Sequence, residues 1–459
     1  MKRNQLIVAL CYLISGALLV PSAGAQATPR IKFEKYKLPN GLEVILHEDH
    51  STPIVAVDTW YHVGSGDEQV GRTGFAHLFE HIMFMGSQNV PVGAFDQMLE
   101  AAGADNNGST TEDRTNYYET LPSNALALAL WLDADRMGFL LPTMDLAKVN
   151  LQRDVVKNER RQRVDNQPYG RADETILAAL YPKAHPYSWP VIGSMADLSA
   201  ASLSDVQNFF RTYYAPNNAT LTIAGDFDPA TVKKMVAQYF GAIPRGPEIK
   251  RRMTVPAVTI PRDTFLVLED KVQLPRVFYT WHSVKNFAPD DAALDILAQI
   301  VANDKNSRLY KKLVYELQTA QNVRAFQDGS RLDGKFQLDV TPKPGQTVAD
   351  IDKVVQTEIA NVINNGVTQR ELQRAQNLYK ASFLNRLASV LGKADVLNSY
   401  NYFVGNPDYV QQDAARYDRV TAADVQRVAK TYLGRPKIVL TVVPEGKKEM
   451  MLTASGGGR

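Results

Sequence analysis

Two hydrophobic patterns run along the 459-residue chain. Apolar and polar residues alternate in some segments, as in β-strands whose successive side chains face opposite sides of a sheet; these are residues 42–48, 54–63 and 219–225. Other segments repeat apolar residues every three or four positions and are expected to be helices: residues 124–139, 146–164, 202–214 and 369–390. Helices grouped between hairpin-like strands favour an α+β fold over a doubly wound parallel sheet.

The pattern occurs twice. The tripeptide DVQ at 205–207 recurs at 424–426, an offset of 219, and the pair TW at 59–60 recurs at 280–281, an offset of 221. Two distant matches with nearly equal offsets indicate a duplicated unit of about 220 residues, a typical domain size. We therefore expect two homologous domains, each a mostly antiparallel sheet packed with helices.

The boundary between the repeats is expected within residues 244–263, which are rich in proline and charge and show no sustained period. The first domain is then assigned to 30–245 and the second to 262–446. The glycine-rich end of the chain, 447–459, is predicted to be a disordered tail.

Residues 1–25 have the pattern of a signal peptide. Two basic residues precede an apolar run from 6 to 20, and Ala23 and Ala25 occupy the small-residue positions of a cleavage site. A signal anchor is the alternative, but this run is shorter than the roughly 20 residues that cross a bilayer. We expect an exported chain, periplasmic or otherwise extracytoplasmic, with no membrane span after cleavage.

Composition narrows the chemistry further. The only cysteine, Cys11, lies in the signal segment, so any metal in the mature chain must be held by His, Asp or Glu. The chain has 51 basic and 49 acidic residues, and removing two basic residues with the signal leaves them balanced. This balance gives no reason to expect a nucleic-acid partner.

The segment GFAHLFEHIMFMG at 74–86 contains the main chemical motif. In a helix, His77, Glu80 and His81 share one face. His-x-x-Glu-His is the inverted zinc-protease pattern, in which both imidazoles bind one metal and the carboxylate acts on bound water. The alternative is two half-exposed histidines on a core helix, although this pattern arises by chance in only about one chain of this size in a hundred.

A catalytic zinc usually has three protein ligands, so a third is required. In the helix expected at 146–164, we predict that Leu151, Val155 and Val156 face inward, which places Glu159 beside the buried face. A glutamate in such a position is most often a surface residue, so spacing alone does not make it a ligand.

The motifs AHLFEH, VVKNERRQ, HPYSWPVIGSMADLSA and YYAPNNATLTIAGDFDP, together with the duplication, resemble the pitrilysin/insulinase family of zinc peptidases. The likeness is greatest to its two-domain branch, which includes the mitochondrial processing peptidase. The resemblance implies that the chain forms half of a clamshell and holds one zinc ion (Zn2+) through His77, His81 and Glu159. It also implies that Glu80 is the general base.

The resemblance further implies that an edge strand beside the metal holds an extended substrate backbone, through Asn107, Gly108, Ser109 and Thr110. Gln152 stands where many relatives carry a second glutamate. A glutamine there can hydrogen-bond in the second shell of the metal but adds no charge, so somewhat weaker metal affinity is expected.

The second repeat departs more strongly from the family. Val314 and Gln321 occupy the places of an arginine–tyrosine pair that steadies the substrate oxyanion in relatives. The positions 221 residues after the metal motif are Ala298, Val301 and Ala302, so the second domain is expected to be inactive. We therefore expect a homologous partner subunit that supplies the pair, with a homodimer or a monomer as alternatives.

The resulting hypothesis is a zinc metalloendopeptidase that hydrolyses extended peptides or unfolded polypeptides, with zinc-bound water activated by Glu80. A non-catalytic peptide-binding or scaffold subunit of a peptidase complex is the alternative. A zinc carrier would predict histidine-rich tracts, whereas the remaining histidines are scattered, at His47, His50, His62, His185 and His282.

Overall fold

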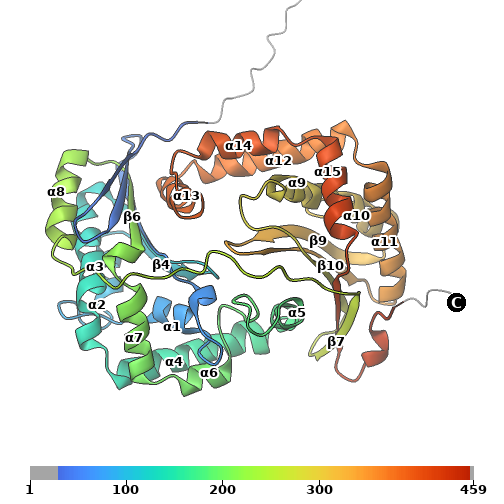
Figure 1. Ribbon diagram of the computed structural model, residues 1–459, viewed down its shortest axis with the longest axis horizontal. Helices are drawn as coiled ribbons and strands as arrows, with labels where there is room; N and C mark the ends of the chain where they lie inside the picture. Colours follow the sequence, from blue (N-terminus) through green and yellow to red (C-terminus); the bar gives the residue numbers. More distant parts are fainter. Residues whose placement is uncertain (1–28, 455–459) are drawn as a thin grey trace, which may run out of the picture.

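The computed structural model describes residues 29–454 and contains two sheets, each with its own set of helices (Figure 1). The six strands of the first sheet lie in the order β1-β2-β6-β3-β5-β4, and the five of the second in the order β7-β11-β8-β10-β9. No helix or strand is assigned between residues 245 and 263, where the chain passes from one repeat to the other. The predicted signal segment lies outside the described residues.

The elements of the first repeat are as follows. Its strands are β1 (Glu34–Lys37), β2 (Glu43–Glu48), β3 (Ile54–Tyr61), β4 (Asp105–Thr110), β5 (Thr115–Pro122) and β6 (Ala219–Gly225). Its helices are α1 (Phe75–Ile82), α2 (Ala94–Ala101), α3 (Leu126–Phe139), α4 (Leu146–Arg160), α5 (Ala172–Leu180), α6 (Met195–Ala200), α7 (Leu203–Tyr213) and α8 (Pro229–Phe240). A π-helical turn, Arg161–Asp165, continues α4.

The second repeat has a similar set. Its strands are β7 (Thr264–Asp270), β8 (Arg276–His282), β9 (Ala320–Gly329), β10 (Gly334–Pro342) and β11 (Ile438–Pro444). Its helices are α9 (Asp291–Val301), α10 (Arg308–Tyr310), α11 (Val348–Asn365), α12 (Gln369–Arg386), α13 (Val390–Phe403), α14 (Val410–Asp418) and α15 (Ala422–Val428).

The two sheets share one topology once β1 is set aside. In each, one outer pair is parallel, β2 with β6 and β7 with β11, and the remaining pairs are antiparallel. The three predicted strands coincide with β2, β3 and β6. The predicted α+β class and the duplicated, mostly antiparallel architecture are therefore confirmed.

The repeats exchange one helix each. Helix α13 of the second repeat packs on β3 and β6 of the first sheet, and α5 of the first repeat packs on β8 and β11 of the second. Successive side chains of β3 show that the first sheet is covered on both faces. Thr59 bonds to Asp133 of α3, whereas Asp58 accepts hydrogen bonds from Asn398 of α13. Neither sheet is thus covered by its own repeat alone.

For residues 447–454, the structure corrects the prediction of a disordered tail at 447–459. Residues Lys448–Met450 form a 3-10 turn, Leu452 is buried in the second core, and its N–H donates to Thr441 Oγ1 at 3.0 Å. An apolar side chain with a place in the core keeps this segment folded despite the glycines that follow. Residues 455–459 lie outside the described part.

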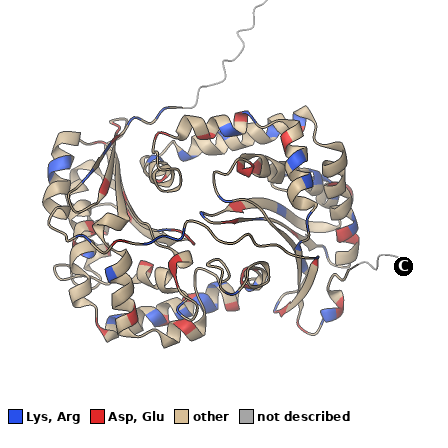
Figure 2. Ribbon diagram, in the orientation of Figure 1, with Lys and Arg blue, Asp and Glu red and all other residues tan. Residues whose placement is uncertain are grey.

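Charged residues are spread over both repeats, with acidic and basic side chains interspersed along most helices (Figure 2). Within residues 29–454, none of the helices has the length and apolar character needed to cross a membrane.

Candidate metal centre

Helix α1 carries the motif and is fixed by its buried face. Phe75, Leu78, Phe79 and Ile82 are buried in the first core. The helical period therefore turns the intervening His77, Glu80 and His81 toward the other side. The apolar residues of α1 thus fix the helix on the core, and its three polar side chains lie together on the opposite side.

The N-terminus of α1 is capped from outside the helix. Gly74 precedes α1 in a left-handed conformation, with φ of 86°, and offers no side chain to cap it. The carboxylate of Glu68 accepts hydrogen bonds from the N–H groups of Gly74, at 3.0 Å, and Ala76, at 2.8 Å, and from Trp189 Nε1, at 3.1 Å. Burial raises the pKa of Glu68 to about 8 in spite of these bonds. Glu68 thereby anchors the first turn of the motif helix.

Helix α4 carries Glu159, and the residue before it, Asp145, caps its N-terminus by accepting the Lys148 N–H at 2.8 Å. The predicted inward stripe is wrong at two of its three positions, because Leu151 and Val155 are 54% and 39% exposed. The buried positions of α4 are Val149, Gln152, Val156 and Arg160.

Two polar residues can take inward positions because each finds a partner. Gln152 Nε2 donates to Met85 Sδ at 2.6 Å, and Arg160 bonds to the Gly193 carbonyl and to Glu174, at 2.9 and 2.7 Å. No hydrogen bond joins Gln152 to the three candidate ligands within the described part of the chain. Its predicted second-shell contact to the metal site therefore remains a prediction.

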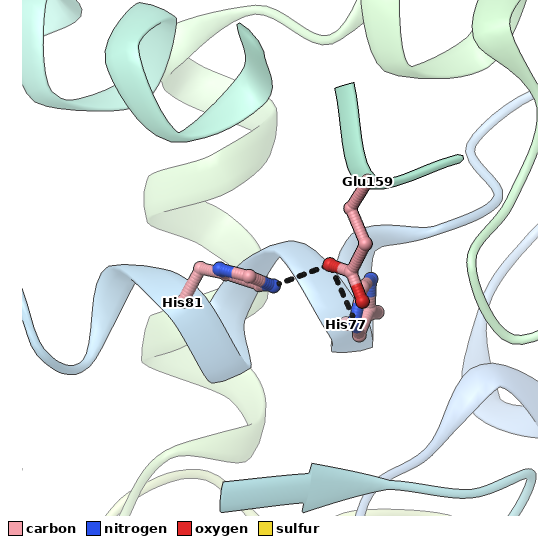
Figure 3. Close-up of side chains that lie close together, drawn as sticks. All are labelled: His77, His81 and Glu159. Carbon is pink, nitrogen blue, oxygen red and sulfur yellow. Dashed lines mark hydrogen bonds and ion pairs between the residues drawn. The ribbon is translucent and has the colours of Figure 1, made fainter. Parts of the chain in front are cut away.

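The structure brings His77 and His81 of α1 together with Glu159 of α4 (Figure 3). Glu159 Oε2 lies 3.6 Å from His77 Nε2 and 3.1 Å from His81 Nε2. One ligand atom from each residue lies within 4.8 Å of the other two, and the imidazole rings are nearly perpendicular, at 85°. Within residues 29–454, this is the only group of three or more His, Cys, Asp or Glu with such geometry.

The electrostatics of the three residues suit a metal. Burial, and then the neighbouring His81, lower the pKa of His77 to about 4, which keeps its imidazole neutral. The hydrogen bond with His81 lowers the pKa of Glu159, and Arg163 Nη1 lies 2.7 Å from its second oxygen, Oε1. Two imidazoles and one carboxylate, largely shielded from solvent, form a donor set that fits zinc.

Glu80 lies on the same helix but outside this group. Its Oε2 accepts a hydrogen bond from Thr110 Oγ1 at 2.6 Å. Burial raises the pKa of Glu80, which brings the carboxylate closer to the range in which it can both take and release a proton. Glu80 could therefore carry a proton without being one of the candidate metal ligands.

Strand β4, at the edge of the first sheet, lies against α1. It contains all four residues expected to bind substrate. Asn107 Oδ1 accepts the Gly108 N–H at 2.8 Å, and the Ser109 hydroxyl donates to Asn116 Oδ1 at 2.7 Å. Among residues 29–454, no strand pairs with the outer edge of β4, which leaves this edge for an added extended chain.

The second repeat has no equivalent chemistry. Ala298, Val301 and Ala302 are buried at the end of α9. Val314 packs against the second core, and Gln321 is exposed on β9.

Sequence reasoning missed three polar residues near the site: Glu68, Arg163 and Arg114. Arg163 has a 77% exposed side chain in a run of charged residues, which is typical of a solvated helix face. Glu68 lies in a loop before α1, where the sequence shows no periodic pattern. Arg114 Nη1 donates to the Ser109 carbonyl of β4 at 2.8 Å, a contact across a hairpin turn. Arg163 follows Glu159 by four residues, so helical spacing was the one signal available.

The fold and this cluster define the class of the protein: a two-domain α+β chain, zinc-protease-like, whose first repeat carries the helix with two of the candidate metal ligands. The family model described as "Insulinase (Peptidase family M16)" matches residues 43–190, and "Peptidase M16 inactive domain" matches residues 200–379. Together they cover well over half of the chain, which belongs to peptidase family M16, the pitrilysin/insulinase family.

Individual relatives agree with this assignment. The chain is 29% identical over 411 residues to zinc protease PqqE of Helicobacter pylori, covering 87% of this chain and 90% of the relative. It is 23% identical to the Arabidopsis thaliana protein named "Probable mitochondrial-processing peptidase subunit beta, mitochondrial", covering 88% and 77%.

Solved structures show the same fold. The crystal structure of a protease from Helicobacter pylori has a TM-score of 0.83 at 26% identity, covering 91% of this chain and all of that one. The periplasmic protease PqqL of Escherichia coli has a TM-score of 0.74 at 19% identity, and the match covers 91% of this chain but 48% of PqqL.

Proposed function

We propose that this protein is a zinc-dependent metalloendopeptidase that hydrolyses peptide bonds in extended peptides or unfolded polypeptides. The observation that carries the proposal is the convergence of His77, His81 and Glu159, with Glu80 beside them and outside the ligand group. Family membership supports it, because several relatives are named zinc proteases.

The residues of the chain have distinct tasks in this proposal. His77, His81 and Glu159 hold the metal, and a bound zinc ion supplies Lewis-acid chemistry that acidifies water and polarises a carbonyl. Glu80 accepts the proton of the attacking water and returns it to the nitrogen of the leaving amine. The open edge of β4 binds the substrate main chain through hydrogen bonds that do not depend on its side chains, so broad sequence tolerance follows.

A partner subunit completes the proposed site. Val314 and Gln321 stand where an oxyanion-stabilising arginine–tyrosine pair is expected, and loss of even one such donor typically costs about 10²–10³ in turnover. A homologous chain that carries this pair would supply it in trans. The relative from Arabidopsis is itself named as a subunit, which supports an assembly of this type.

Export is part of the proposal. It rests on the signal-like pattern of residues 1–25, and PqqL, with the same fold, is described as periplasmic.

The test combines metal analysis with peptide cleavage. The purified chain should contain about one zinc per molecule and, together with its partner, cleave an unstructured fluorogenic peptide. The double variant His77→Ala, His81→Ala should lose both zinc and cleavage, whereas His50→Ala, at a 60% exposed side chain far from α1 in sequence, should retain both. Stoichiometric zinc in the double variant would refute the site. Zinc without cleavage of any peptide would favour the non-catalytic subunit.

A further inference from the structure

Strand β4 touches Glu80 at two points. Thr110 Oγ1 donates to Glu80 Oε2 at 2.6 Å. Two residues earlier, the strand comes so close to α1 that a Cβ added to Gly108 would lie 3.0 Å from Glu80 Cγ. The strand therefore contacts both the methylene stem and the carboxylate of the same side chain.

Side chains along a β-strand point alternately to its two faces, which explains why these two residues both lie next to Glu80. Side chains at even positions, Gly108 and Thr110, face α1. The Ser109 side chain bonds instead to Asn116, on the opposite face of the sheet. The hydroxyl of Thr110 is engaged by Glu80, so it is not a free substrate contact, whereas the main chain of β4 takes no part in this bond.

We infer that Thr110 is a positioning residue for Glu80: its hydroxyl fixes Oε2 and leaves Oε1 to face the reacting water. A glutamate side chain without a partner samples several rotamers. A general base must lie within about 2.6–3.2 Å of the proton it takes, and a misplacement of about 1 Å can cost roughly 100-fold in rate. The inference rests on the proposed peptidase function, in which Glu80 is the general base, and adds that Thr110 holds this base in position.

One consequence follows from the shared strand. The same six residues, Asp105–Thr110, would bind substrate along their outer edge and hold Glu80 on their inner face. The general base and the substrate main chain are then positioned by one rigid element.

Kinetics of isosteric variants test the inference. In zinc-loaded enzyme with its partner, Thr110→Val should lower kcat by about 10- to 100-fold with KM within about twofold, while Thr110→Ser should restore kcat to within about threefold of wild type. Thr120→Val makes the same change on β5 opposite Asp105, at the other end of β4, and should leave kcat unchanged. In the Glu80→Gln background, Thr110→Val should have no further effect on kcat, because no base remains to be positioned.

A second readout does not depend on activity. Thermal unfolding of the zinc-loaded single and double variants should show that Thr110→Val lowers Tm by about 2–4 °C in the wild-type background and by much less in Glu80→Ala. Additive Tm shifts, or an active Thr110→Val enzyme with kcat within twofold of wild type, would overturn the inference. A wild-type protein that cleaves no peptide would instead refute the proposed function, while the Tm cycle would still decide whether Thr110 holds Glu80.

Discussion

The carboxylate of Glu80 bonds to a threonine hydroxyl of β4, whereas the neighbouring His81 belongs to the group of candidate metal ligands. This geometry predicts that Glu80→Gln keeps the fold and about one zinc per chain, because the amide replaces the carboxylate at equal size outside the ligand group. Activity should fall by about 10²–10⁴, since an amide cannot accept the proton of water. Zinc analysis and steady-state kinetics measure the two effects separately.

Glu100→Gln is the matched control, because it makes the same change at an exposed position of α2. It should retain both zinc and turnover. Near-normal turnover of Glu80→Gln, or loss of its zinc, would contradict the assigned role.

At the residue scale, the sequence was sufficient to identify site residues that lie close together along the chain. His77, Glu80 and His81 could be recognised because a five-residue motif on a helix defines its own geometry. Glu159 came from a family resemblance, and no pattern pointed to Glu68, whose carboxylate reaches α1 from a separate loop. A contact between a loop and a helix depends on how the chain folds in three dimensions. The spacing of residues along the sequence does not show it.

At the scale of elements, the failed part of the α4 prediction is instructive. Hydrophobicity alone placed Leu151 and Val155 inward, but the inner face takes Gln152 and Arg160 because both are satisfied by hydrogen bonds there. Burial of a polar residue is permitted when its partners exist, and those partners lie on other elements. The strands predicted at 42–48, 54–63 and 219–225 were easier to recognise, since the pattern of each is local to a short segment.

The exchanged helix α13 gives a stability prediction. Asn398, 1% exposed, donates to the Asp58 carbonyl and carboxylate, both at 3.0 Å, and accepts from Thr222 Oγ1 at 2.7 Å. Asn398→Ala removes three buried hydrogen bonds and leaves the Thr222 hydroxyl without this acceptor, although the Asp58 carboxylate keeps Trp60 and Asn116 as donors. The change should lower the free energy of unfolding by about 2–4 kcal/mol. Urea denaturation measures the loss.

The control for this change is Asn385→Ala, at an exposed position of α12. It should change stability by less than about 0.5 kcal/mol. An equally small loss for Asn398→Ala would show that α13 is not held to the first sheet by this contact.

At the scale of the whole molecule, His62 links three parts of the chain. Its Nε2 lies 3.0 Å from Thr220 Oγ1, its ring lies 4.8 Å from that of Tyr402 on α13, and its carbonyl accepts from Arg251 of the connecting segment. Burial, and then the positive charge of Arg251, lower the pKa of His62 to about 3. The folded protein therefore holds the His62 imidazole in its neutral form.

The sign of the pH dependence follows. Below a pH of about 6.5 the unfolded chain protonates His62 and the folded chain does not, so its contribution to stability is complete above that pH and declines toward pH 3. The advantage of wild type over His62→Gln should therefore shrink between pH 7 and pH 4, by roughly 2–4 kcal/mol. Urea denaturation at several pH values provides the measurement.

His50→Gln is expected to show the opposite sign. Hydrogen bonds to Asp226 and Glu48 raise the pKa of His50, so its contribution to stability is present at low pH and lost as the pH rises through the raised pKa.

For His62, the contrary outcome is a pH profile of stability that runs parallel in wild type and His62→Gln. Parallel profiles would exclude a neutral imidazole at this position.

The proposal that a partner subunit supplies the oxyanion-stabilising pair predicts how the isolated chain behaves. The isolated chain, loaded with zinc, should cleave an unstructured peptide at least about 100-fold more slowly than the chain mixed with a homologous subunit that carries the arginine–tyrosine pair. Replacing that arginine in the partner should abolish the gain. Full activity of the isolated chain, unchanged when the partner is added, would instead support a self-sufficient monomer or homodimer.

The helix exchange also sets an order for synthesis. Helix α5 is made long before β11, the strand of the second sheet on which it packs, and the first sheet waits for α13 until the ribosome has passed residue 403. The amino-terminal repeat of a nascent chain therefore keeps one face of its sheet bare until nearly nine-tenths of the polypeptide exists. The last contacts of the first sheet thus form only after most of the second repeat has been synthesised.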